Sequence, residues 1–169
     1  VIGWISPPNT WDSMTYHMSR VVHWIQDRSV ANYPTHILRQ LHQNPWSEFA
    51  ILHFQVLSGS DRFANLIQWF SMIGTIVGVS LLAKQLGASS RGQILAAVIS
   101  VTIPMGILQG SSTQNDYVVS FWLVCFIYYA ILLKENSKPL YLLATGAGLG
   151  LSILTKATAY IYAFPFMAW

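Results

Sequence analysis

The chain has 169 residues, of which 53% are hydrophobic and only 9% are charged. A soluble globular domain carries about 25% charged residues, so this composition is typical of a membrane protein. The net charge of +3 comes without a cluster of Lys and Arg, which argues against a nucleic-acid partner, and the single Cys125 excludes a disulfide framework.

An amphipathic helix is predicted over residues 9–27, with Pro7 and Pro8 upstream and Asn9 or Thr10 as its cap. Its apolar stripe consists of Met14, Met18, Val21 and Ile25. Its polar face consists of Asp12, Tyr16, Ser19, Arg20, His23 and Asp27. The same pattern is found on ordinary solvated surface helices, so this stretch alone does not decide between a site and a surface.

Two shorter helices are predicted before the first long apolar stretch. One follows a break at 32–34, and the other begins at Pro45 and ends before Gly59. The second is apolar but only about 13 residues long, whereas a spanning helix needs about 20. We therefore expect residues 45–57 to lie at the membrane surface.

The remaining chain predicts membrane spans at about 63–83, 93–108, 117–133 and 140–154, and the start of another at 157–169. The expected fold is all-α, a polytopic transmembrane bundle over residues 63–169. The expected first extracytoplasmic loop, residues 1–62, carries amphipathic juxtamembrane helices. Because both ends look cut, we expect a fragment of a larger protein that forms a single incomplete domain.

The loop charges predict the topology. Loops 84–92 and 134–139 each carry two basic residues, whereas loop 109–116 carries none. The positive-inside rule then places the first two loops in the cytoplasm and the third on the extracytoplasmic side. Counting back through the first span puts residues 1–62 on that side as well.

Three ionisable residues are predicted to meet at the extracytoplasmic face, namely Asp12, Asp116 and Lys156. Each has an ordinary alternative, since Asp116 is also placed as a helix cap and Lys156 as a lysine that snorkels to the interface. The histidines are expected in polar packing. His17 and His23 are six residues apart and share no helical face, so no metal site is predicted there.

Four stretches resemble a known class when taken in order: WDSMTYHMSR around Asp12, NPWSEFAILHF at 44–54, TQNDYVVSFWLV at 113–124 and GLGLSILTKATAYIYAFP at 148–165. They resemble the polytopic glycosyltransferases of the GT-C class, and within it the protein O-mannosyltransferase and aminoarabinose transferase superfamily. The chain has no second acid after Asp12 and no Glu-Lys-Pro-Pro stretch before residue 45. The donor sugar and any metal requirement therefore stay open.

The resemblance implies that Asp12 is the catalytic carboxylate, that Asp116 supports the same cavity and that Lys156 neutralises the phosphate of a lipid-linked donor. Further substrate-binding candidates are Arg20, Arg39, Tyr16 and His23. Sugar transfer from a polyprenyl phosphate needs a base at the acceptor and a cation at the departing phosphate. No cofactor is required by the pattern, and a divalent cation is left open.

The predicted function is therefore an integral-membrane glycosyltransferase, multi-pass in a bacterial-type plasma or inner membrane, that uses a polyprenyl-phosphate-linked sugar on the extracytoplasmic side. Its partners would be the lipid bilayer and that donor. A transporter fragment is the first alternative, but the span interiors between residues 63 and 154 hold no ionisable residue. A non-catalytic membrane protein is the second, and it would not need the polar face around Asp12.

Overall fold

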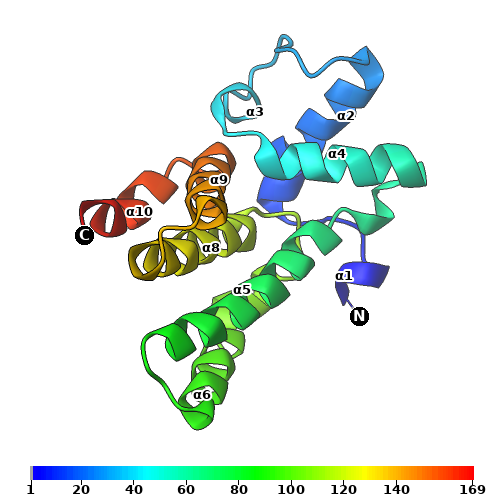
Figure 1. The fold of residues 1–169 in the computed structure, drawn as a ribbon. Helices are drawn as coiled ribbons and strands as arrows, with labels where there is room; N and C mark the ends of the chain where they lie inside the picture. The colour runs from blue at the N-terminus through cyan, green and yellow to red at the C-terminus, as the bar shows by residue number, and fades with distance from the viewer. Residues whose placement is uncertain (1) are drawn as a thin grey trace.

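The computed structural model describes residues 2–169, and these residues form helices and no strand (Figure 1). The α-helices are α1 (Ile2–Ile5), α2 (Met18–Asp27), α3 (Arg39–His42), α4 (Trp46–Ser58), α5 (Leu66–Gln85), α6 (Ser90–Val101), α7 (Pro104–Gln109), α8 (Asp116–Glu135), α9 (Pro139–Thr155) and α10 (Ala159–Ala168). A π-helical turn, Ser13–His17, precedes α2, and a 3-10 turn, Asp61–Phe63, precedes α5. The predicted all-α fold is confirmed.

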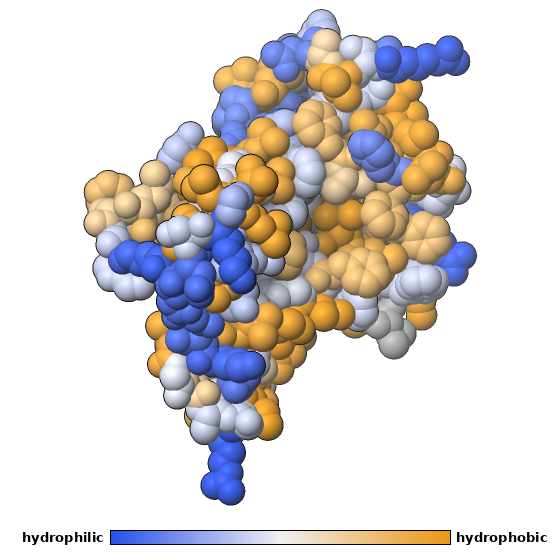
Figure 2. Space-filling model, in the orientation of Figure 1, coloured by the Kyte–Doolittle hydropathy of each residue, from blue (hydrophilic) through white to orange (hydrophobic). Residues whose placement is uncertain are grey.

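Two helices are long and apolar enough to cross a membrane, Asp61–Gln85 and Asp116–Glu135. They cover the residues predicted as the first and third spans. The apolar helices α6, α9 and α10 are shorter, at 10–17 residues. Figure 2 shows hydrophobic surface over much of the face turned to the viewer, with hydrophilic side chains at the upper end and at the lower tip of the α5–α6 connection.

The segment predicted as a short span over 93–108 is divided into two shorter helices, α6 and α7. The division falls at Ile103, whose backbone is extended with φ −62° and ψ 115°. The following Pro104 lacks an N–H group and disfavours the helical conformation of the residue before it. Thr102 Oγ1 donates to the carbonyl oxygens of Val98 at 2.9 Å and of Ile99 at 3.1 Å, in the last turn before the break.

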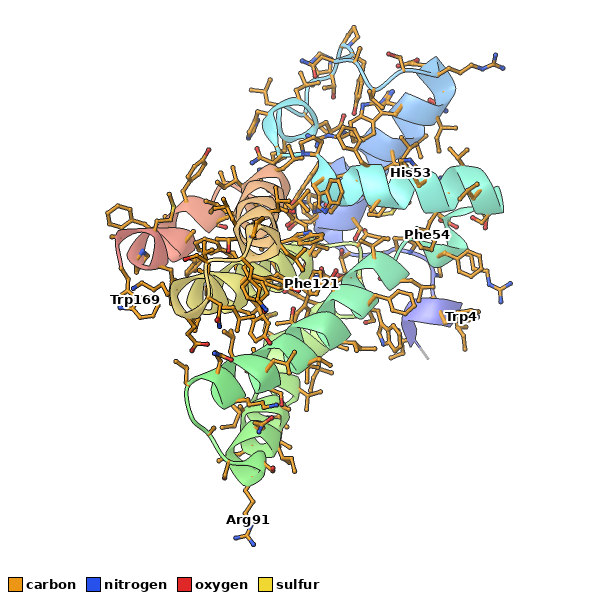
Figure 3. All side chains as sticks on the ribbon, in the orientation of Figure 1. Trp4, His53, Phe54, Arg91, Phe121 and Trp169 are labelled. Carbon is orange, nitrogen blue, oxygen red and sulfur yellow. The ribbon has the colours of Figure 1, made fainter. Side chains whose placement is uncertain are left out.

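Helices α5, α8 and α9 pack closely because glycines let them approach. A side chain at Gly148 would begin 2.8 Å from the backbone nitrogen of Phe126, and one at Gly74 would meet the ring of Phe121. Figure 3 shows Phe121 between α5 and α8. Small residues at helix–helix contacts are the usual means of close packing within membranes.

The start of α8 is fixed from α5 by one buried amide. Gln68 Oε1 accepts hydrogen bonds from the backbone N–H groups of Tyr117 at 3.1 Å and Val118 at 3.3 Å. These donors lie in the first turn of a helix, where the backbone N–H groups have no partner within the helix. Gln68 therefore replaces a capping side chain, and it sets where the chain enters α8.

The N-terminal part of the chain packs on one end of the bundle. Thr113 Oγ1 donates to Ser13 Oγ at 2.6 Å, and the Asn44 side-chain amide donates to the carbonyl oxygen of Ile153. Both bonds are long-range, and they join residues before α5 to the loop before α8 and to the last turn of α9.

The opposite end of the bundle brings together the two basic connections. Gln85 Nε2 donates to Glu135 Oε2 at 2.6 Å, so loops 84–92 and 134–139 lie at the same end. The helix that carries Asp12 lies at the other end. The two basic loops and Asp12 thus lie at opposite ends of the bundle, which is the arrangement that the loop charges predict.

The predicted helix at 9–27 forms, with Thr10 Oγ1 accepting from the N–H of Ser13 at 3.3 Å. Met18 and Val21 of its apolar stripe are buried in a core with Ile51 of α4. Met14 and Ile25 of the same stripe are 59% and 36% exposed. The π-helical turn adds a residue between Met14 and α2, which rotates Met14 away from the core.

Candidate functional site

Asp116 and Lys156 form an ion pair between the first residue of α8 and the residue after α9. Lys156 Nζ lies 2.6 Å from Asp116 Oδ1, and the two side chains are 32% and 38% exposed. Asn115 holds the two helix ends together, because its side-chain amide donates to the carbonyl oxygen of Thr155 at 3.2 Å. The pair is therefore positioned by the backbone and remains accessible.

An apolar groove of about 580 Å³ runs from this ion pair along α8 and α10. Its lining residues are Asp116, Val119, Ser120, Leu123, Val124 and Ile127 from the α8 side, with Lys156, Thr158, Tyr162 and Phe166 from the α10 side. Apart from the ion pair, Ser120 and Thr158, the walls are apolar or aromatic. A groove of this kind suits a ligand with a charged head and a hydrocarbon chain.

Asp12 lies beside a second cation. Asp12 Oδ1 is 3.8 Å from Arg39 Nη1, and both side chains are accessible. The Arg39 guanidinium also lies 5.9 Å from the centroid of the Tyr16 ring. These three residues form a polar group on the surface of the N-terminal part.

Tyr16 is the partly buried member of this group. Burial and the negative charges nearby, first that of Asp12, together raise its pKa to about 12, while the Arg39 guanidinium opposes the shift. The phenol stays protonated at neutral pH and is available as a hydrogen-bond donor.

Arg20, expected among the donor-binding residues, is only 2% exposed. Its Nε donates to the carbonyl oxygen of Gln40 at 2.5 Å, its Nη2 donates to the carbonyl oxygen of Arg39 at 3.0 Å, and its Nη1 lies 3.8 Å from Glu48 Oε1. These contacts attach the segment around α3 to α2. The structure therefore places Arg20 in the packing beneath Asp12 and Arg39.

His23 is also separate from the ionic groups. Its ring stacks on the ring of Tyr33, with the two centroids 4.1 Å apart. His36, His42 and His53 are exposed. Among residues 2–169, no group of three or more His, Cys, Asp and Glu side chains is close enough to hold a metal ion.

Sequence reasoning missed the most deeply buried hydrogen-bonded pair of titratable side chains among residues 2–169, His17 and Glu48, whose Nδ1 and Oε1 atoms are 2.6 Å apart. One signal was available. Glu48 is the only acidic or basic residue of α4 apart from a histidine. Because Glu48 lies three positions before the core residue Ile51, both side chains fall on the same side of that helix.

The two apolar helices of spanning length fit an integral membrane protein of the helical class. The family described as dolichyl-phosphate-mannose-protein mannosyltransferase matches residues 44–169, most of the chain. The chain belongs to this family. The predicted resemblance to GT-C class glycosyltransferases is thereby confirmed, and the chain is assigned to a membrane glycosyltransferase. A search of curated proteins returned no match, and a search of solved structures returned none.

Proposed function

We propose that this protein transfers a sugar from a polyprenyl-phosphate-linked donor to an acceptor on the extracytoplasmic face of the membrane. The observation that carries the proposal is the Asp116–Lys156 ion pair at the head of the apolar groove along α8 and α10. The groove would hold the first part of the lipid chain, and Lys156 would contact the phosphate. The family description names dolichyl phosphate and mannose, so mannose is the first sugar to test.

The topology belongs to the same proposal. Residues 1–62 would form an extracytoplasmic loop with juxtamembrane helices, and residues 63–169 would form the transmembrane bundle. The basic loops at the α5–α6 and α8–α9 connections support this orientation, because they lie together at the end opposite to Asp12.

In the proposed reaction the acceptor hydroxyl oxygen bonds to C1 of the sugar while the bond between C1 and the phosphate oxygen breaks. Asp12 accepts the hydroxyl proton as general base. The electron pair of the broken bond leaves with the polyprenyl phosphate, whose charge Lys156 and Arg39 neutralise. Tyr16 would donate a hydrogen bond to the sugar or phosphate, and Asp116 would orient Lys156. Arg20 has no direct role because its guanidinium is buried.

The test uses the complete encoded protein in membranes, with dolichyl-phosphate mannose carrying radiolabelled mannose and native host membranes as the source of acceptor. Asp12→Asn should lower kcat by about a hundredfold to ten-thousandfold, the range for a general base. Lys156→Met should raise the KM for the donor by roughly tenfold to a hundredfold, as expected for a lost charge-assisted contact.

The matched control is Asp27→Asn, which removes an exposed acid at the end of α2 and should leave transfer unchanged. Wild-type transfer by Asp12→Asn would overturn the role of Asp12. Labelling of single cysteines at positions 12, 88, 116 and 137, in a Cys125→Ala background, tests the topology. If positions 12 and 116 react from opposite sides of the membrane, the proposed site cannot exist.

A further inference from the structure

Four buried side chains join α2 and the turn before it to the start of α4, namely His17, Arg20, Ser47 and Glu48. The proposed chemistry uses none of them directly. Glu48 is completely buried, with Oε1 2.6 Å from His17 Nδ1 and 3.8 Å from Arg20 Nη1. Its Oε2 accepts a hydrogen bond from Ser47 Oγ at 2.9 Å. Burial of a carboxylate is unfavourable even when it is paired, so this cluster calls for an explanation.

The cluster fixes one end of an unusual helical turn. Residues 13–17 are π-helical, a rare geometry that occurs mostly as single turns and often at functional sites. His17, the last residue of the turn, bonds to Glu48, while Ser13, the first, accepts a hydrogen bond from Thr113 at 2.6 Å. Buried hydrogen bonds to segments far away in the sequence therefore hold both ends.

This turn sets the direction of Asp12 and Tyr16. Asp12 directly precedes the turn and Tyr16 lies within it, and both face Arg39. One residue of an α-helix corresponds to roughly 100° of rotation about its axis. Relaxation of the π-helical turn into an α-helix would therefore rotate Asp12 by that amount relative to α2, away from Arg39.

We propose that Glu48, acting through His17, is a positioning residue that holds the π-helical turn and keeps Asp12 directed toward the acceptor. The inference rests on the proposed function, in which Asp12 is the base. The hydrogen bond of His17 to Glu48 is made by Nδ1, and the other ring nitrogen, Nε2, is buried with no hydrogen-bond partner among residues 2–169.

The first test compares Glu48→Gln with Glu135→Gln, the same substitution at the only other glutamate of the chain. Glu135 is exposed at the far end of the bundle. Glu48→Gln should lower kcat for mannose transfer by about a hundredfold, the cost of misplacing a catalytic group by about 1 Å. The KM for dolichyl-phosphate mannose should stay within about twofold, because the donor-binding Lys156 is unaffected. Glu135→Gln should match the wild type in both constants.

Two substitutions at His17 separate positioning from stability. The side-chain amide of His17→Asn can donate to Glu48 much as Nδ1 does, whereas His17→Leu cannot. His17→Asn should retain most of the wild-type kcat. His17→Leu should lower kcat by the same factor as Glu48→Gln. A cross-linking measurement that is independent of turnover uses Asp12→Cys with Arg39→Cys in a Cys125→Ala background and a short bismaleimide. The cross-link should form more slowly when Glu48→Gln is added and at an unchanged rate when Glu135→Gln is added.

The outcomes distinguish this inference from the proposed function. Absence of mannose transfer by the wild type would overturn the proposed function, whereas full transfer by Asp12→Asn would overturn the role of Asp12 as base, and the role of Glu48 with it. If Asp12→Asn is inactive while Glu48→Gln and His17→Leu keep wild-type kcat, only the positioning role fails. Equal loss in His17→Asn and His17→Leu, with cross-linking unchanged by Glu48→Gln, would also overturn it.

Discussion

Gly148 of α9 offers a measurable test of how closely the membrane helices pack. A β-carbon at this position would lie 2.8 Å from the backbone nitrogen of Phe126 and 3.0 Å from its Cα. Ordinary contact begins near 3.4 Å, so Gly148→Ala must separate α8 from α9 by roughly 0.6 Å. Backbone atoms cannot rotate away as a side chain would.

The expected cost follows from that separation. Overpacking by one methyl group in a tight interior costs about 1–3 kcal/mol. The same helix provides two controls, because a β-carbon at Gly146 or Gly150 would meet nothing within 4 Å. Alanine favours the helix over glycine by about 1 kcal/mol, so both control variants should be as stable as the parent or more stable.

The assay is thermal unfolding of the complete protein in lipid nanodiscs, followed by loss of helical circular dichroism. Gly148→Ala should melt on the order of 5 °C below Gly146→Ala and Gly150→Ala, given about 2–4 °C per kcal/mol for a chain of this size. Equal melting temperatures for all three variants would refute the close approach of α9 to α8 and the separation worked from it.

Three further measurements test other parts of the structure. The pKa of Tyr16 is raised from 10 to about 12, so its contribution to stability is constant below pH 10 and falls as the pH rises toward 12. Phenolate absorbance is titrated in the wild type and in Tyr16→Phe, and the difference between the two curves should be a step near pH 12. A step near pH 10 would contradict the burial of this phenol. Gln68→Leu leaves two N–H groups at the start of α8 without an acceptor and should cost about 1–3 kcal/mol, whereas Gln68→Glu keeps an acceptor and should lose less in the same melting assay. Ile51→Ala, at a residue that is 1% exposed, should cost about 2–5 kcal/mol, and Val56→Ala, at one that is 62% exposed, should change the stability by less than about 0.5 kcal/mol. Equal losses at these last two positions would argue against the core between α2 and α4.

The sequence predicted the long helices well because their signal is local. The stretches at 63–83 and 117–133 are mostly apolar and end near charged or turn-forming residues, and the bounds of α5 and α8 lie within three residues of them. The break at Ile103 follows from Pro104, which is visible in the sequence, whereas hydrophobicity alone does not divide 93–108.

The buried cluster at Glu48 could not be predicted in the same way. Its partners lie 31 and 28 positions away in the sequence, and only the packing of α2 on α4 brings them together. The π-helical turn is equally hidden, because no residue pattern distinguishes it from an α-helix. Helical periodicity alone places Arg20 on an open polar face. The segment around α3 covers that face, and the sequence does not reveal this contact.

The direction of the helices at Asp116 and Lys156 has a consequence for the ion pair. Each helix carries a macrodipole, with partial positive charge at its first residues and partial negative charge at its last. Asp116 begins α8 and Lys156 follows the last residue of α9, so each ion is stabilised by its own helix as well as by its partner. In the proposed reaction the donor phosphate would draw Lys156 from Asp116, and Asp116 would keep the favourable field of α8. Opening the pair would therefore cost less than separating two isolated ions.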